Sequence, residues 1–215
     1  MPARKVIYRK RIRMKNKSIF LLLIPLILFA SCQTTKNLDK KDKSEGTANN
    51  QPKTEPVYVT NTKKVYLLPP ENMAGAVDNI QLLNGSFGDQ TFSLLVYFQS
   101  DQKGIFMSLL NDFGTDMGNI SYDGEKVDYQ SSYFPANLKA EYILLDIQNA
   151  YYKVESLKSL YEKAGLIFEA EGEDGYLRTI KNGQNLIEEI EITSNSINIK
   201  NYLRGYEYNL VKGDE

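Results

Sequence analysis

Hydrophobic and polar residues alternate along most of the chain after residue 77. In residues 91–100 every second residue is apolar, while the residues between them are mixed. This period of two, with one wholly apolar face, predicts a half-buried β-strand. The apolar face consists of Phe92, Leu94, Val96 and Phe98.

Turn-forming dipeptides divide this region into short segments. Asparagine or aspartate followed by glycine readily adopts the positive φ angles of tight hairpins. These dipeptides are Asn84-Gly85, Asp123-Gly124, Asp174-Gly175 and Asn182-Gly183. The segments predict antiparallel strands at residues 105–110, 119–122, 126–130, 166–171, 175–181, 185–193, 196–203 and 206–211. A further short strand is expected at residues 65–68, ended by the two prolines that follow it.

The middle of the region has helical periodicity instead. Residues 137–151 place apolar side chains three and four positions apart, which predicts an amphipathic helix capped by Asn137. A second helix is predicted over residues 155–164, with Gly165 as its stop. The apolar stripe of the first helix consists of Ala140, Ile143, Leu144, Ile147 and Tyr151.

Two β-meanders separated by two helices predict an α+β domain. Many antiparallel strands in one sheet favour a strongly curved sheet, or half-open β-barrel, and the two helices would cover its concave face with their apolar stripes. If the helices do not fill the curve, an apolar cavity remains between them and the sheet.

The start of the chain has a different pattern. Eight basic residues and no acidic ones precede an apolar run over residues 19–30, which is too short for the roughly 20 residues of a membrane-spanning helix. A basic region, a short apolar region and small residues are typical of a secretory signal peptide, here residues 1–31. The sequence Phe29-Ala30-Ser31-Cys32 resembles a bacterial lipobox, so we expect Cys32 to carry the lipid. The alternative is an ordinary secretory signal followed by an incidental cysteine.

Residues 32–64 are polar and charged with few apolar side chains, so they predict a disordered tether. The remaining residues, 65–215, form one predicted domain. The full chain has a formal charge of −1 and residues 1–31 carry +8, so residues 32–215 carry −9. This acidity argues against nucleic acid as a partner. Membrane attachment would then depend on the N-terminal acyl chains. We expect the protein to be a monomer.

The composition also limits the chemistry. The chain has no histidine, and Cys32 is its single cysteine, which excludes serine or cysteine nucleophiles activated by histidine and zinc sites of histidine and cysteine. An enzyme would need two carboxylates converging in a cleft, and the acidic residues favour solvated positions instead. Glu188 in particular is expected to be exposed. Lys139 and Arg178 are expected to pair with carboxylates at the surface, and a lipid head group is the alternative partner of Arg178. We therefore expect no enzymatic activity, no cofactor and no metal.

Short segments of the chain resemble a family of bacterial lipoproteins of unknown function. They are residues 114–124, Phe134-Pro135 and residues 142–148, and the match extends over about residues 79–210. That family is similar to the LolA/LolB lipoprotein carrier and receptor proteins. The resemblance implies an open β-barrel with a helical lid and a cavity for acyl chains.

One loop extends the resemblance. In the receptor branch an apolar residue before a glycine protrudes between two strands and helps to insert cargo into the membrane. Phe113-Gly114 follows the strand at residues 105–110 and corresponds to that loop, although the preceding proline is absent and phenylalanine replaces leucine. The alternative is that Phe113 folds back into the core.

The resulting hypothesis is a lipoprotein of the cell envelope, in the outer membrane, which binds acyl chains or lipoproteins and aids their transfer or insertion. The alternative is a non-catalytic scaffold lipoprotein with a filled interior that docks on an envelope partner. The residues expected to line the cavity are Phe92, Leu94, Val96, Phe98, Ile105, Met107, Leu109, Ile143, Leu144 and Ile147.

Overall fold

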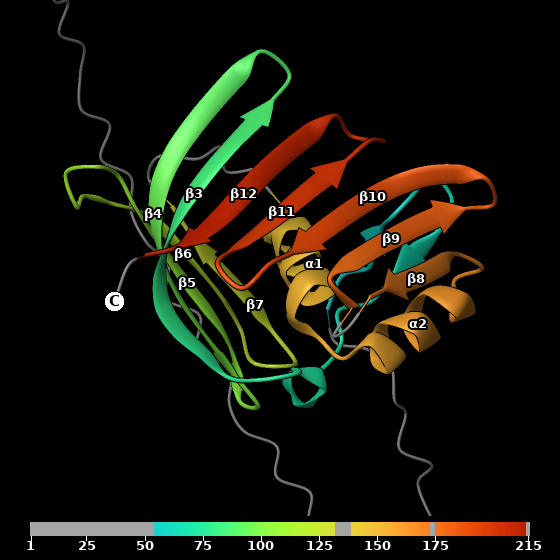
Figure 1. The fold of residues 1–215 in the computed structure, drawn as a ribbon. Coiled ribbons are helices and arrows are strands. Elements are labelled where there is room, and N and C mark those ends of the chain that lie inside the picture. The colour runs from blue at the N-terminus through green and yellow to red at the C-terminus, as the bar shows by residue number, and fades with distance from the viewer. Residues whose placement is uncertain (1–53, 132–138, 173–174, 214–215) are drawn as a thin grey trace, which may run out of the picture. The chain divides into compact units, whose positions relative to one another are not determined.

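The computed structural model describes residues 54–131, 139–172 and 175–213, and its main element is one ten-stranded antiparallel sheet (Figure 1). The first five strands are β3 (Val77–Phe87), β4 (Gln90–Asp101), β5 (Gly104–Leu110), β6 (Asp116–Tyr122) and β7 (Val127–Gln130). The last five are β8 (Ile167–Glu171), β9 (Leu177–Asn182), β10 (Asn185–Ile192), β11 (Ser196–Asn201) and β12 (Tyr206–Lys212).

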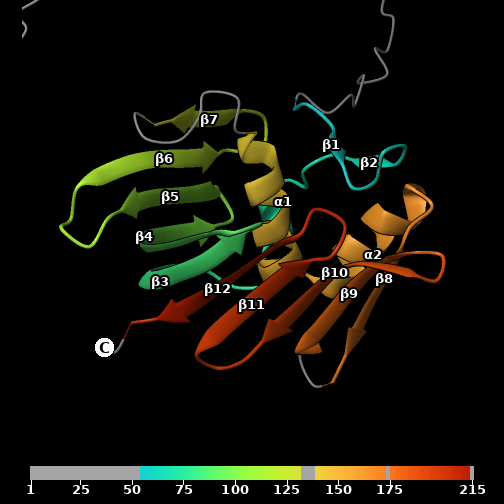
Figure 2. The same ribbon diagram turned by 90° about the horizontal axis from the view of Figure 1, so that it is seen from above.

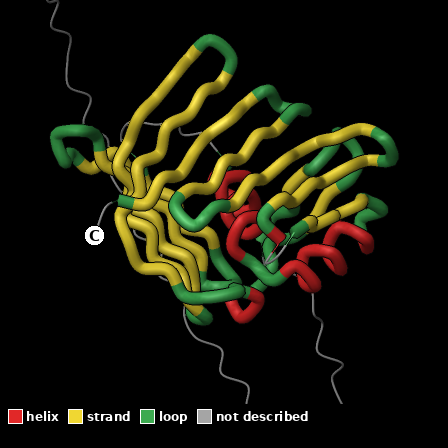
Figure 3. The backbone as a smooth tube through the Cα atoms, viewed as in Figure 1, coloured by secondary structure: helices red, strands yellow, loops and turns green. Residues whose placement is uncertain are grey.

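The two predicted meanders are joined through their first and last strands. The strand order is β7-β6-β5-β4-β3-β12-β11-β10-β9-β8, so β3 and β12 pair at the centre of the sheet. Their register places Leu83 opposite Leu210 and Gly85 opposite Tyr208. The sheet ends at β7 and β8 and is therefore open, and it curves strongly, as the backbone tube shows (Figure 3).

Helix α1 (Ala140–Tyr151) lies within the curve of the sheet, and α2 (Val154–Lys163) packs beside β8 (Figures 1 and 2). Most of α1 is buried, including Leu144 and Ile147 on its predicted stripe and three polar residues. A helix that is buried almost all round needs packing partners on more than one side. The sheet supplies one side, and the start of the described chain supplies another.

That starting segment consists of β1 (Val57–Tyr58), β2 (Lys64–Val65) and the short 3-10 helix η1 (Pro70–Asn72). Val57 pairs with Val65, and both side chains are buried. Gln148 of α1 holds the segment by accepting a hydrogen bond from the backbone N–H of Leu68 and donating one to its carbonyl, both at 2.9 Å. The folded structure therefore includes the last residues of the predicted tether.

The described residues all fall within one compact unit, residues 48–215. Every buried apolar residue of the described core belongs to it. We therefore expect a fragment of residues 48–215 to fold without the preceding chain. The predicted signal peptide, Cys32 and the Asn137 cap lie outside the described residues.

The predicted turn at Asn84-Gly85 is wrong, because both residues lie inside β3. The hairpin between β3 and β4 turns at Gly88, whose φ is +58°. Gly85 has a different role: a Cβ there would lie 2.3 Å from Cζ of Phe92, so the absence of a side chain lets that ring lie across the strand. The turns at Asp123-Gly124 and Asn182-Gly183 are confirmed, with glycine φ angles of +96° and +61°.

Candidate ligand-binding cavity

An apolar cavity of about 700 Å³ lies between the inner face of the sheet and the first two turns of α1. Its volume is within the range of about 300–1,000 Å³ that is usual for small-molecule sites. Among the described residues that line it, only four carry a charged group or an aliphatic hydroxyl. The lining residues are Leu83, Ser86, Phe87, Phe92, Leu94, Met107, Leu109, Ile120, Lys139, Tyr142, Ile143, Asp146, Ile147, Arg204, Tyr206, Tyr208 and Leu210.

Six of the ten residues expected to line a cavity are among them: Phe92, Leu94, Met107, Leu109, Ile143 and Ile147. The other four, Val96, Phe98, Ile105 and Leu144, are fully buried in the packed core instead. The correction has a physical reason, because α1 and the starting segment cover the sheet further along β4. Phe98, for example, packs against Tyr151 at the end of α1, with 4.9 Å between the ring centroids.

Asp146 and two tyrosines give the cavity a polar patch that the sequence did not predict. The hydroxyls of Tyr206 and Tyr208 donate to Oδ2 of Asp146 at 2.7 and 3.1 Å. The two rings stack with 6.0 Å between their centroids, and both belong to the inward face of β12. In the sequence, the alternation of Tyr206, Tyr208 and Leu210 with polar residues already indicated which side chains of this strand point inward.

A second carboxyl group lies behind this patch. Glu188 was expected at the surface, but it is only 4% exposed. Its Oε1 accepts a hydrogen bond from the amide of Asn149 at 2.9 Å, and its Oε2 accepts one from the amide of Asn201 at 3.0 Å. The hydroxyl of Tyr161 donates to Oδ1 of Asn149 at 2.8 Å and completes the network.

Burial raises the pKa of Asp146 well above its ordinary value, and the neighbouring charge of Glu188 raises it further. Burial also raises the pKa of Glu188, while hydrogen bonds from Asn149, Asn201 and Asp146 act in the opposite direction. When the two carboxyl groups share one proton, Asp146 is therefore the one that holds it. Because both oxygens of Glu188 are occupied and only Asp146 lines the cavity, the pair offers a ligand one carboxyl group rather than two.

The rim of the cavity beside α1 carries two cations, Lys139 and Arg204. The guanidinium of Arg204 lies 4.5 Å from the centroid of the Tyr142 ring and donates to the carbonyl of Tyr58. The Lys139 ammonium lies 3.5 Å from a carboxylate oxygen of Glu55, and both side chains are largely exposed. The starting segment of the domain therefore passes close to these two cations.

Phe113 is 92% exposed, so it does not fold back into the core. The loop that holds it is well organised: Oδ1 of Asn111 accepts hydrogen bonds from the backbone N–H groups of Phe113 and Thr115, at 3.0 and 2.9 Å. Gly114 follows with a φ of +73°, which a glycine adopts readily. A solvent-exposed aromatic side chain on a short, hydrogen-bonded loop is a candidate for contact with a membrane or a partner.

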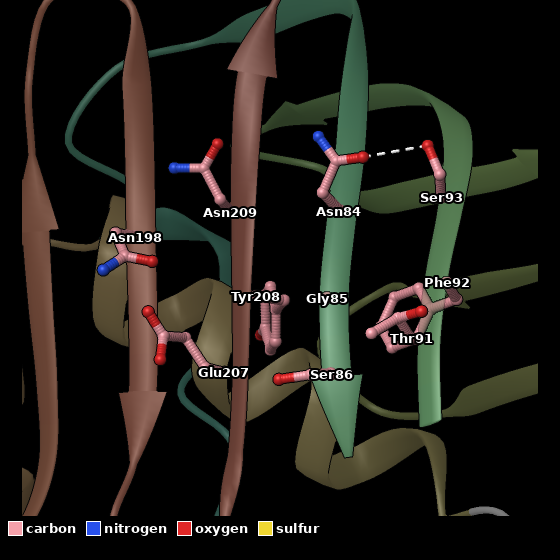
Figure 4. Close-up of a pocket in the computed structure, with 10 residues that line it drawn as sticks. All are labelled: Asn84, Gly85, Ser86, Thr91, Phe92, Ser93, Asn198, Glu207, Tyr208 and Asn209. Atoms are coloured by element: carbon pink, nitrogen blue, oxygen red, sulfur yellow. Dashed lines mark hydrogen bonds between the residues drawn. The ribbon is translucent and has the colours of Figure 1, made fainter. Parts of the chain in front are cut away.

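A second hollow lies on the outer face of the sheet, across β11, β12, β3 and β4 (Figure 4). It is bordered by a polar row, in which the Ser93 hydroxyl donates to Oδ1 of Asn84 at 2.8 Å. The hollow is shallow and widely open to solvent, with Phe92 and Tyr208 among polar neighbours, and it presents no enclosed site for a ligand. In the part of the chain that the structure describes, no group of three or more acidic, histidine or cysteine residues is placed to hold a metal ion. Across the same residues no helix is long and apolar enough to span a membrane.

The fold and the cavity define an α+β protein with an open antiparallel sheet and an apolar cavity beneath its first helix. Within that class, the chain belongs to the family described as a protein of unknown function (DUF3261), whose model matches residues 78–212. That range extends from the second residue of β3 to the end of β12, so it includes all but the first residue of the ten-stranded sheet and both α-helices. No curated protein matches the chain.

Proposed function

We propose that this protein is a non-catalytic lipoprotein of the cell envelope that binds acyl chains, or the acyl part of lipoproteins, in the cavity beneath α1. The single observation that carries the proposal is a cavity wall on which only four of the described residues carry a charged group or an aliphatic hydroxyl. Each methylene group removed from water contributes about 0.8 kcal/mol, so such a wall suits a hydrocarbon chain. The resemblance to the LolA/LolB proteins supports the same function.

The alternative of a scaffold lipoprotein assumed a filled interior, and the cavity favours the first proposal. Transfer of cargo would need no covalent step, only a difference in affinity between donor and acceptor. In this proposal Cys32 carries the acyl anchor and the outer membrane is the site of action.

The binding test compares two isoleucines changed in the same way. Ile143 is half-buried and lines the cavity, whereas Ile80 is 54% exposed on the outer face of β3. In the fragment 48–215, Ile143→Asn should weaken binding of a fluorescent fatty acid about fivefold or more, because an unpaired buried amide costs about 1–3 kcal/mol. Ile80→Asn should leave the affinity unchanged.

Fluorescence titration measures both affinities, and circular dichroism checks that each variant is folded. Absence of saturable binding by the unchanged fragment, to fatty acid and to acylated peptide alike, would overturn the proposal. Equal effects of the two substitutions would place the binding site elsewhere.

Phe113 is proposed to contact the membrane during delivery. Phe113→Ser should reduce binding of the fragment to phospholipid vesicles several-fold, because the variant has no aromatic ring at this position to bury in the membrane. The affinity for a soluble fatty acid should stay the same, since Phe113 does not line the cavity. Vesicle co-sedimentation measures the first quantity. Unchanged co-sedimentation would assign Phe113 no role at the membrane.

A further inference from the structure

The charges at the cavity are unevenly placed. Three charged residues line it: Asp146 on the inner side of α1, and Lys139 and Arg204 at the rim. Residues 32–215 carry a net charge of −9. The two cations that line the cavity therefore give it a local charge opposite in sign to that of the protein as a whole. The described contacts show what each cation already binds.

Arg204 is held in place but keeps unused hydrogen-bond donors. Its backbone N–H donates to Oδ1 of Asn201 at 2.9 Å, and its guanidinium packs over the ring of Tyr142. Within the described part of the chain, its guanidinium donates one hydrogen bond, to the carbonyl of Tyr58. Among the described residues, no carboxylate lies within ion-pair distance of it. A guanidinium has five N–H donors, so this one can still bind an anion through two of them.

Lys139 has a weak partner. Its ion pair with Glu55 is 3.5 Å long and joins side chains that are 61% and 74% exposed. Exposed pairs of this kind contribute little, so an anion at the rim competes with Glu55 easily. Both cations therefore remain available on the same side of the cavity.

We infer that Arg204 and Lys139 bind the negatively charged head group of a lipid whose acyl chain occupies the cavity. The inference rests on the proposed function and specifies its ligand as an acyl chain that ends in a carboxylate or a phosphate. The planar donors of Arg204 match either oxyanion, and Lys139 adds a second positive charge. The apolar wall receives the chain and the rim receives the charge.

Among the described residues, Asp146 is the one carboxyl group that lines the same cavity. Burial and the charge of Glu188 raise the pKa of Asp146, while the hydroxyls of Tyr206 and Tyr208, which donate to its Oδ2, and the charge of Arg204 act in the opposite direction. The two hydroxyls reduce the negative charge that this carboxyl group presents to the cavity, and Arg204 and Lys139 supply the positive charge there.

The test compares ligands with the same chain and different head groups. Palmitate, hexadecanol and palmitoyl lysophosphatidic acid are titrated into the fragment 48–215 at pH 8, by displacement of the neutral probe N-phenyl-1-naphthylamine. Palmitate should bind about tenfold more tightly than hexadecanol at low salt, and the preference should shrink at high salt because salt screens exposed charges. The lysophosphatidic acid distinguishes a phosphate site from a carboxylate site.

The variants test the two cations. Arg204→Gln should reduce the preference for palmitate over hexadecanol to about twofold or less, with the larger loss of affinity for palmitate, and Arg204→Lys should restore part of the preference. Glu55→Gln should strengthen palmitate binding, because it removes the competing carboxylate. Lys103→Gln, at an exposed hairpin position, is the control and should change nothing.

Each outcome decides the inference. If the unchanged fragment binds palmitate and hexadecanol equally, or if Arg204→Gln weakens both equally, the acyl cavity stands and the head-group site is overturned. If neither ligand binds, the proposed function fails and the head-group site fails with it.

Discussion

Replacing Arg178 with alanine is expected to lower the free energy of unfolding by about 3–5 kcal/mol, because it leaves buried carbonyl groups without donors at about 1–3 kcal/mol each. Arg178 is only 5% exposed on the inner face of β9. Its Nη1 donates to the carbonyls of Asn149 and Tyr152 at 2.7 and 3.0 Å, and its Nε donates to the carbonyl of Gly175 at 3.3 Å.

Among the described residues no carboxylate pairs with Arg178, and these contacts explain how the buried cation is tolerated. Asn149 and Tyr152 belong to the C-terminal end of α1, where helix carbonyls have no partner within the helix and carry partial negative charge. Arg178 therefore caps α1 from the sheet and joins the two layers. The expectation of a surface ion pair was wrong, because burial is decided by how α1 crosses the sheet.

Thermal and urea unfolding of the fragment 48–215 measure the effect, which should lower the melting temperature by roughly 6–20 °C. Arg178→Lys keeps the charge but has a shorter reach to the carbonyls, so it should lose less stability than alanine. Lys181→Ala, on the same strand and paired only with the exposed Glu169, is the control and should stay within about 0.5 kcal/mol. If Arg178→Ala also lowered the free energy of unfolding by no more than about 0.5 kcal/mol, that result would contradict the capping role of Arg178.

Local sequence patterns predicted the elements well, because strand alternation and helical spacing depend on neighbours in the chain. The stripe of residues 140–151 and the alternating faces of β4 and β12 are where they were expected. The pairing of β3 with β12 joins segments more than 100 residues apart in the sequence, and no local pattern encodes it. That pairing merges the two meanders into one sheet and places the cavity at its centre.

The candidate site was predicted only in part, for a related reason. Alternation identifies the inward face of β4 but does not say which part of that face is covered. Leu94 lines the cavity, whereas Val96, two positions on, is fully covered. Glu188 was missed because charged residues are rarely buried, although it occupies an inward position in register with Ile180 and Asn201. Its amide partners become neighbours only in the folded chain.

Replacing Asp146 with asparagine is expected to remove a large part of the pH dependence of stability. Burial raises the pKa of Asp146 in the folded state, so the folded state binds its proton more tightly than the unfolded chain does. The stabilisation from that proton is complete below the unfolded pKa of about 3.9 and is lost as the pH rises through the folded pKa. The free energy of unfolding should thus fall by up to about 1.4 kcal/mol per pH unit in that window for one proton.

Asparagine is a suitable replacement because it resembles the protonated acid. Its carbonyl oxygen can accept from Tyr206 and Tyr208 as Oδ2 of Asp146 does, and its amide can donate toward Glu188. Asp146→Asn should therefore match the unchanged fragment near pH 4 and exceed it in stability at pH 8. Urea unfolding between pH 4 and pH 8 measures the difference, with the exposed Asp89→Asn as control.

The free energy of unfolding of Asp146→Asn should still fall somewhat as the pH rises. That remaining slope is due to Glu188, whose pKa is also raised by burial. Because the two carboxyl groups titrate as a pair, the double variant with Glu188→Gln should lose the remaining dependence on pH in this window. If the unchanged fragment has the same stability at pH 4 and pH 8, or if Asp146→Asn keeps its full slope, then Asp146 is ionised in the folded protein. An ionised Asp146 would place a negative charge on the cavity wall and weaken anionic ligands, so this measurement also bears on the head group that the rim selects.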